Sequence, residues 1–198
     1  MARKGELAMN DLQRRWLEKN RIGIIDEVNR DMFVYVREAI AIKMGEGGPP
    51  ITVHISSGGG AVVWGLDIYD LINFYPGKKV GVVHSMAASM ASIILQACDW
   101  RTATPYASVL IHHVNNQNLK LDVARDKNEL EKFIAGMEKS QSKLYEILVR
   151  RTGKPMEEIS ARCKMEESMT AQEALNYHLI DQIVVQESDV VIPEPEKK

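Results

Sequence analysis

One serine occupies a position that suits nucleophilic chemistry. Ser89 lies where an apolar strand is expected to turn into a helix, and it is flanked by the small side chains of Ala87, Ala88 and Ala91. A hydroxyl at this point faces the carboxyl end of a parallel sheet, where ligands collect in open α/β folds. Serine attacks a carbonyl only when a base removes its proton and fixed donors stabilise the oxyanion. Taken alone, the position is also typical of a serine that merely caps its helix.

Residues 57–60, Ser-Gly-Gly-Gly, are expected to form a tight turn between a strand and a helix. Such a turn leaves backbone N–H groups uncovered, which suits a phosphate or a carbonyl oxygen that becomes negative. The phosphate interpretation loses support because no Lys-Ser/Thr pair follows to make a P-loop, and Val62 and Val63 interrupt the dinucleotide-binding pattern. An oxyanion-binding site and a simple connecting turn both remain open here.

Five histidines are candidate bases. His112 and His113 follow an apolar strand, and because adjacent strand side chains point to opposite faces, only one of them can join a given site. His54 and His84 also lie near strand ends, and His178 lies in a predicted surface turn, so residue type alone does not select the base. No H-x-x-x-H or C-x-x-C spacing is present, so we expect no metal, and nothing suggests a cofactor.

Composition and charge narrow the functional class. The 198 residues, 45% of them hydrophobic, suit one compact core, and a formal charge of -2 gives no field that attracts nucleic acid or anionic lipid. The two cysteines, Cys98 and Cys163, are typical of a reducing compartment. Residues 1–20 lack the apolar core of a secretion signal, and the apolar run at 86–98 is too short to cross a bilayer. We therefore expect a cytoplasmic protein with no membrane or nucleic-acid partner.

Alternating strand and helix patterns must position these residues. Apolar runs at 51–55 and 79–83 predict buried strands, and helices are expected at 61–74 and 88–98. Two such strand-turn-helix units imply parallel strands joined by crossover helices, and hence an α/β fold. The other expected elements are helices at 11–19, 30–44, 122–150, 156–163 and 170–177, the last with a Thr170–Glu173 capping box, strands at 21–25, 108–111 and 179–185, an extended exposed segment at 114–121, and a disordered tail at 186–198.

Several of these segments have the order and spacing of one protease family. They are Ser-Gly-Gly-Gly at 57–60 followed by Ile-Tyr-Asp at 68–70, Ala-Ala-Ser-Met-Ala at 87–91, Leu-Ile-His-His at 110–113, and the run at 170–181. They resemble the S-P-G-G and I-Y-D, A-A-S-M-G, M-I-H-Q and S/T-A-x-E-A-x-x-Y-x-L-I-D motifs of ClpP, the proteolytic subunit family of the ATP-dependent Clp protease. The resemblance covers roughly residues 16–185.

That resemblance implies catalytic roles for four residues. Ser89 would attack the peptide carbonyl, while His112 takes its proton and later passes it to the leaving amine. Gly60 and Met90 would supply the N–H groups of the oxyanion hole.

The chain departs from the family pattern at several positions. Glu166 stands where the family has the aspartate of its catalytic triad, and we expect it to orient His112, with Glu167 as a substitute; a solvated pair of glutamates is the alternative. Residues 115–121 contain no glycine, in contrast to the family's glycine-rich strand. The short, polar segment 1–12 argues against docking to an AAA+ unfoldase.

The resemblance also implies the fold and the activity. We expect a ClpP/crotonase-type spiral of repeated ββα units in a single peptidase domain over residues 1–198, with a core at about 16–185. The ends at 1–12 and 187–198 would be flexible, and residues 122–150 would project as a long handle helix. The implied function is a serine endopeptidase that cleaves unfolded polypeptides within a homo-oligomeric chamber of stacked heptamers, including a phage-type variant. A crotonase-type acyl-CoA enzyme and an inactive subunit that assembles with an active paralogue are the alternatives.

Overall fold

The computed structural model describes residues 9–115 and 119–190. The chain divides into two compact units, which we describe separately: unit 1 comprises Met1–Leu110 and Ser168–Lys198, and unit 2 comprises Ile111–Glu167. Unit 1 contains a sheet of mostly parallel strands together with helices, so the α/β class predicted from the sequence is confirmed. The single domain expected over residues 1–198 stays a prediction.

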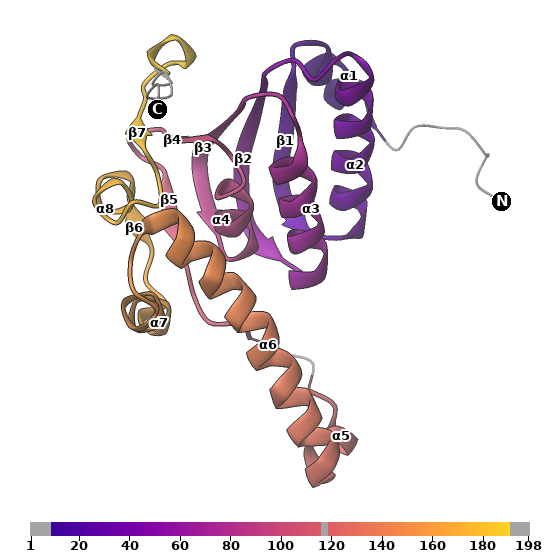
Figure 1. The fold of residues 1–198 in the computed structure, drawn as a ribbon, viewed down its shortest axis with the longest axis vertical. Helices are drawn as coiled ribbons and strands as arrows, with labels where there is room; N and C mark the ends of the chain where they lie inside the picture. Colours follow the sequence, from indigo (N-terminus) through magenta and orange to yellow (C-terminus); the bar gives the residue numbers. More distant parts are fainter. Residues whose placement is uncertain (1–8, 116–118, 191–198) are drawn as a thin grey trace, which may run out of the picture. The chain divides into compact units, whose positions relative to one another are not determined.

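The strands of the described residues form one sheet, all of it in unit 1 (Figure 1). Strands β1, β2, β3, β4 and β7 follow in that order, and each neighbouring pair is parallel. The short β5 runs parallel to β3, and β6 pairs with β5 in the antiparallel sense. The strand bounds are β1 Arg21–Val28, β2 Ile51–Gly60, β3 Lys79–Ala88, β4 Trp100–Ala103, β5 Ser108–Leu110, β6 Met169–Thr170 and β7 Gln182–Ile183.

Strand β3 changes its partner along its length. Residues 80–83 pair with β4, whereas residues 86–88 pair with β5. Between these stretches His84 and Ser85 are exposed, and the pairing of β3 with β2 is irregular there. Because one strand serves two sets of neighbours, the sheet branches at β3, in agreement with the spiral that the resemblance implied.

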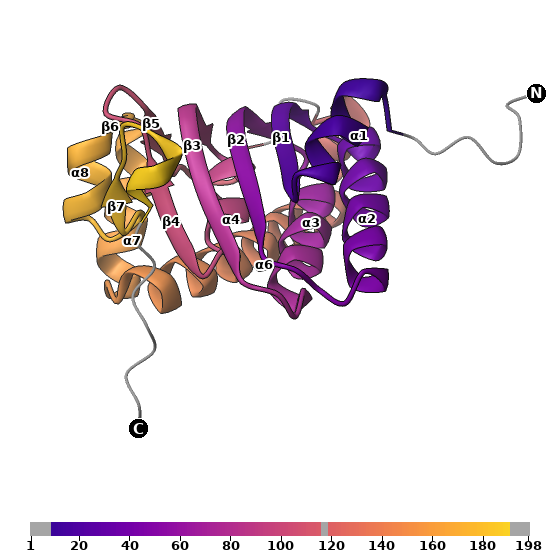
Figure 2. The same cartoon turned by 90° about the horizontal axis from the view of Figure 1, so that it is seen from above.

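Helices α2, α3 and α4 cover one face of the sheet, and α1 packs beside β1 (Figure 2). Side chains at the helix starts satisfy free backbone N–H groups: Asn10 forms a capping box with Gln13, and the predicted box of Thr170 and Glu173 is confirmed. The helices of unit 1 are α1 Asp11–Glu18, α2 Arg30–Gly45, α3 Val62–Phe74, α4 Met90–Leu95 and α8 Ala171–Asn176. Between them and the sheet lies an aliphatic core that includes Ile22, Ile24, Val53, Ile55, Ile68, Ile72 and Ile94.

Several predicted boundaries in unit 1 were wrong. Residues 57–60 are not a tight turn, because they continue β2 alongside β1, with Gly60 opposite Val28. The helix predicted at 88–98 is shorter, since β3 extends through Ala88 before α4 begins. The strand predicted at 179–185 reduces to β7, because the chain before it turns to place Asp181 against β4.

The described parts of the chain ends make defined contacts, and their expected flexibility stays a prediction. Met9 is buried, and the short 3-10 helix η1, Glu187–Asp189, is part of the described structure. Glu187 forms an ion pair with Arg21 of β1, and the Asp189 carboxylate accepts hydrogen bonds from backbone N–H groups of the preceding turn. Residues 1–8 and 191–198, on which the remaining expectations for the two ends depend, lie outside the described residues.

Unit 2 contains α5 Leu121–Arg125, α6 Lys127–Thr152 and α7 Met156–Met165. The long helix predicted at 122–150 is confirmed from Lys127 onward, but its start was wrong, because the chain is extended at Asp126, whose side chain caps α6 by accepting N–H bonds from Asn128 and Glu129. The extended segment predicted at 114–121 was wrong at Leu121, which begins α5, while residues 116–118 lie outside the described residues.

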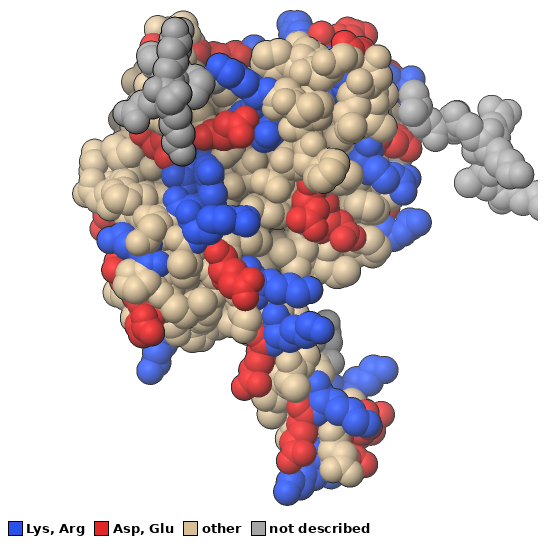
Figure 3. All heavy atoms as spheres, viewed as in Figure 1, with Lys and Arg blue, Asp and Glu red and all other residues tan. Residues whose placement is uncertain are grey.

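Charges of both signs alternate along α5 and α6 (Figure 3), as their charged sequence predicts. In the described ranges, no helix is both long and apolar enough to cross a membrane.

A buried ion pair fastens the end of the unit 1 fold to its sheet. Arg101 of β4 donates from both Nε and a terminal nitrogen to the Asp181 carboxylate, and its other terminal nitrogen donates to Gln96 Oε1 at 2.5 Å. The Arg101 backbone N–H also donates to Asp181 at 2.8 Å. This pairing gives a structural role to the aspartate of the Leu-Ile-Asp motif.

We expect Asp181→Asn to lower the free energy of unfolding by about 3–5 kcal/mol, because it leaves the buried Arg101 charge without a counterion. Glu131→Gln is the control, since it removes only an exposed ion pair with Lys127 and should change stability by less than about 0.5 kcal/mol. Urea denaturation followed by circular dichroism measures both, and equal midpoints for the two variants would contradict this role.

Candidate functional site

Ser89 joins β3 to α4 in a strained backbone conformation. Its φ of 54° and ψ of -125° are rare for a residue with a side chain. Its N–H donates to Leu110 O of β5 at 2.9 Å, and its carbonyl accepts from Ser92 N at 3.0 Å. The half-buried side chain makes no capping bond to α4, so the helix-cap interpretation fails. The turn is therefore held by backbone bonds, which leave the hydroxyl available for chemistry.

The glycine segment of β2 lies directly against this turn. A Cβ added at Gly59, where φ is 94°, would lie 2.6 Å from Ser89 Cβ and 2.9 Å from Met90 N. A Cβ added at Gly60, where φ is 153°, would lie 2.3 Å from Val28 O. Both positions therefore require glycine, and the structure brings the predicted site residues Gly60, Ser89 and Met90 to one region of unit 1.

Two close-packed glycines, Gly59 and Gly65, were given no individual role from the sequence. Gly59 makes the contact with Ser89, although Gly60 alone was assigned a role. Gly65 lies inside α3, where an added Cβ would be 2.4 Å from the Met90 side chain. A glycine in a helix interior costs stability and so indicates close packing, which is the signal that could have identified Gly65.

The adjacent histidines of unit 2 differ in their surroundings. The His113 ring is within 3.2 Å of Ser160 O through Nε2 and packs edge-on against Tyr145. His112 is partly exposed, and no described residue of unit 2 hydrogen-bonds its ring. Of this pair, His113 is engaged in packing, and His112 is the imidazole that remains available as a base.

The candidate acids stand at the end of α7. Glu166 is the C-cap of this helix with a left-handed φ of 52°, and both Glu166 and Glu167 are exposed. Within unit 2, the Glu166 carboxylate makes no hydrogen bond or ion pair with a described residue. The Glu167 carbonyl accepts a hydrogen bond from Arg162. The role of either carboxylate in orienting His112 stays a prediction.

Two further histidines and one cysteine, His54, His84 and Cys163, fit chemistry less well. Burial lowers the pKa of His54 to about 4, with further contributions from His84 and Arg21, so His54 is neutral and weakly basic near neutral pH. Its Nδ1 lies 2.8 Å from His84 Nε2, and Trp16 packs against its ring. Burial raises the pKa of the Cys163 thiol to about 12, which makes it a poor nucleophile. These groups stabilise the packing and do not compete with Ser89 as nucleophile.

Substitutions in the glycine segment test the required backbone approach. Gly60→Ala should lower stability by at least about 1–3 kcal/mol, because the new Cβ meets the Val28 backbone and the φ is unfavourable. Gly58→Ala is the matched control: position 58 is exposed, nothing lies within 4 Å of an added Cβ, and the substitution should be neutral or stabilising by about 0.4–1 kcal/mol. Thermal unfolding of both variants measures the difference. Similar unfolding midpoints for the two variants would rule out the close approach of Gly60 to the Val28 backbone.

A comparison with protein-family models identifies the family of the chain. The model described as Clp protease matches residues 3–187, which include the strained serine, the glycine segment and both histidines after β5. The match extends over nearly all of the 198 residues. The chain therefore belongs to the Clp protease family.

Proposed function

We propose that this member of a peptidase family is a serine endopeptidase with Ser89 as nucleophile and His112 as general base. The observation that carries the proposal is the strained turn at Ser89. There a hydroxyl that makes no capping hydrogen bond to α4 lies beside the glycine segment of β2. Backbone strain of this kind persists only where the surrounding structure holds it, and it is common in nucleophile turns between a strand and a helix.

The chain itself supports the pairing of serine and imidazole. Ser89 N–H donates to Leu110 O, and His112 follows Leu110 by two residues. Two residues of chain span no more than about 7 Å, so the proposed pairing requires no long connection between Leu110 and His112. His113, one residue further, is engaged by Ser160 and Tyr145.

The mechanism follows the roles of these groups. His112 removes the hydroxyl proton as Ser89 Oγ attacks the peptide carbonyl, and the backbone N–H groups of Gly60 and Met90 donate to the resulting oxyanion. His112 then protonates the leaving amine, which releases the first product and leaves an ester on Ser89. Water, deprotonated by the same imidazole, hydrolyses that ester and restores the hydroxyl.

Glu166 is the acid that we assign to His112. Its left-handed backbone ends α7 and turns the chain at this residue, and its carboxylate is not committed to another partner in unit 2. A carboxylate orients the imidazole and stabilises its protonated form. Glu167 is the substitute for this acid. The second candidate function is an inactive subunit, which is favoured by the absence of the family's aspartate and by the exposure of Glu166.

Active-site labelling tests the nucleophile. A fluorophosphonate probe should label the purified protein at Ser89, and Ser89→Ala should abolish labelling and reduce peptide hydrolysis by at least about 10³-fold. Ser85→Ala, which removes a nearby exposed hydroxyl, should retain both the labelling and the peptide hydrolysis.

The assignment of the acid is tested by peptide hydrolysis. Glu166→Gln should lose roughly 10⁴-fold in kcat if the carboxylate orients His112, whereas Glu167→Gln should not. For the nucleophile, fluorophosphonate labelling that survives in Ser89→Ala, or that is absent from the folded wild-type protein, would rule out the proposed enzyme.

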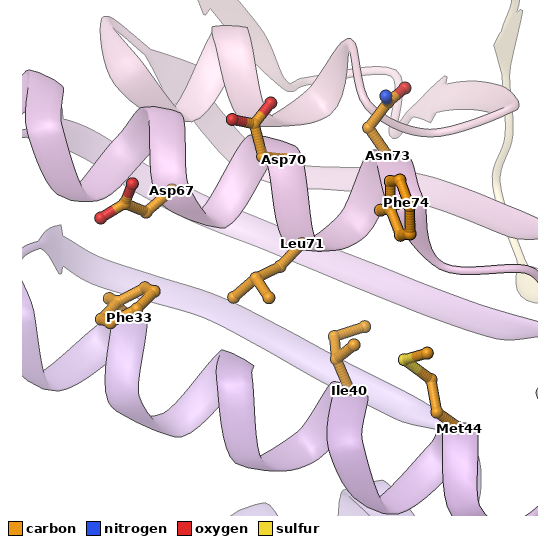
Figure 4. A pocket seen from close by; sticks show the side chains of 8 residues that line it. All are labelled: Phe33, Ile40, Met44, Asp67, Asp70, Leu71, Asn73 and Phe74. Atoms are coloured by element: carbon orange, nitrogen blue, oxygen red, sulfur yellow. The ribbon is translucent and has the colours of Figure 1, made fainter.

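The proposal includes a homo-oligomer that encloses the site, for which stacked heptamers are the expected form. A groove of about 550 Å³ runs between α2 and α3 (Figure 4). Its lining is mostly apolar, and Asp67, Asp70 and Asn73 of α3 complete it beside Phe33, Ile40, Met44, Leu71 and Phe74. Phe74 is 85% exposed and Met44 48%. Apolar surface of this kind favours burial against another protein, and a second copy of the chain is the partner that the family supports.

Phe74→Asp should therefore lower the mass of the assembly measured by light scattering after size-exclusion chromatography, because it replaces an exposed phenyl ring of the groove with a further negative charge beside Asp67 and Asp70. Tyr106→Asp is the matched control at another exposed aromatic residue, 98% exposed, and should leave the mass unchanged. Both substitutions should alter the stability of the folded chain by no more than about 0.5 kcal/mol. An unchanged mass for Phe74→Asp would remove this groove from the interface.

A further inference from the structure

We propose that Ser57 is a positioning residue that fixes the oxyanion-binding amides, and this inference rests on the proposed serine peptidase function. Its hydroxyl donates to Asp26 O of β1 and accepts from Gly59 N–H at 3.1 Å. Ser57 is 2% exposed, so water does not compete for these bonds. A serine hydroxyl has one proton, and once that proton is given to Asp26 the lone pairs are directed to other donors such as Gly59.

The bonds occur where the regular ladder between β1 and β2 is interrupted. Ile25 pairs with Ser56 and Glu27 with Gly59, so Asp26 alone faces both Ser57 and Gly58. Asp26 has a left-handed φ of 66°, which a bulged strand accommodates. Because the regular ladder is interrupted at this bulge, the Ser57 side chain supplies the link between the two strands.

The link controls the position of the glycine segment relative to the nucleophile. Gly59 lies against Ser89 and Met90, and Gly60 lies against Val28. Gly58, between Ser57 and Gly59, is exposed and has no side chain to pack. A shift of Gly59 would therefore carry the Gly60 N–H away from the place where the oxyanion forms, and donors must lie within about 2.7–3.1 Å of that place.

The expected effect is on the transition state more than on substrate binding. Ser57→Ala should lower kcat by about 10- to 100-fold, while KM changes by less than about twofold. Ser56→Ala is the matched control, because the neighbouring hydroxyl bonds to Ser85 of β3 and takes no part in the glycine segment, so kcat should stay unchanged. Ser57→Thr keeps a hydroxyl and should recover most of the lost kcat.

Two further measurements separate positioning from a general loss of structure. A peptide aldehyde, which adds reversibly to the serine hydroxyl and places an oxygen at the oxyanion position, should lose at least about tenfold more affinity in Ser57→Ala than the matching peptide alcohol does. Amide hydrogen exchange of residues 58–60 should accelerate at least about tenfold in Ser57→Ala and remain unchanged in Ser56→Ala. If Ser57→Ala does not fold, Ser57→Cys, with a similar shape and a weaker donor, is assayed in the same way.

The outcomes distinguish the two proposals. Equal loss of aldehyde and alcohol affinity, or a kcat in Ser57→Ala equal to that of Ser56→Ala, would overturn the positioning role. Should the wild-type protein neither hydrolyse peptides nor react with the fluorophosphonate, the peptidase proposal fails. Hydrogen exchange then tests by itself whether the Ser57 hydroxyl holds the glycine segment in place. Unchanged exchange at residues 58–60 would then overturn it.

Discussion

The contact between two backbones, Gly59 of β2 and Ser89 after β3, is the constraint on which the candidate site depends. No side chain fits between them, since an added Cβ at Gly59 would lie 2.6 Å from Ser89 Cβ. The same tight fit continues outward, because Gly60 lies against Val28 and Gly65 admits the Met90 side chain. The buried aliphatic core keeps the strands and α3 at these separations, so the glycines set the geometry and the core maintains it.

The sequence predicted the elements whose signals are local and repetitive. Runs such as 51–55 and 79–83 indicated parallel strands, and Thr170 with Glu173 indicated a helix start, because these patterns depend on near neighbours. Residues 57–60 were misassigned to a turn, since glycine favours turns unless a partner strand such as β1 holds it extended. The helix break at Asp126 was missed for a similar reason: helical periodicity continues across it, and only the capping bonds identify the boundary.

For the site, the position of Ser89 between a strand and a helix made it a candidate nucleophile, and the family motifs assigned that role to it and the role of base to His112 instead of His113. The contacts of His113 with Ser160 and Tyr145 provide an independent reason for that choice, which no sequence pattern contains because the three residues are far apart in the chain. The Ser57 hydroxyl escaped attention for the same reason, since its acceptor lies on another strand, 31 positions earlier. The role of Glu166 stays a prediction.

The positive φ at Ser89 has a cost in folding stability. Glycine would adopt this conformation without the steric penalty that a side chain incurs, so the fold itself favours loss of the hydroxyl at position 89. Under the proposed function, selection for the nucleophile opposes that loss. In a duplicated gene copy without that selection, glycine at position 89 would relieve the strain of this turn and remove the hydroxyl in one substitution.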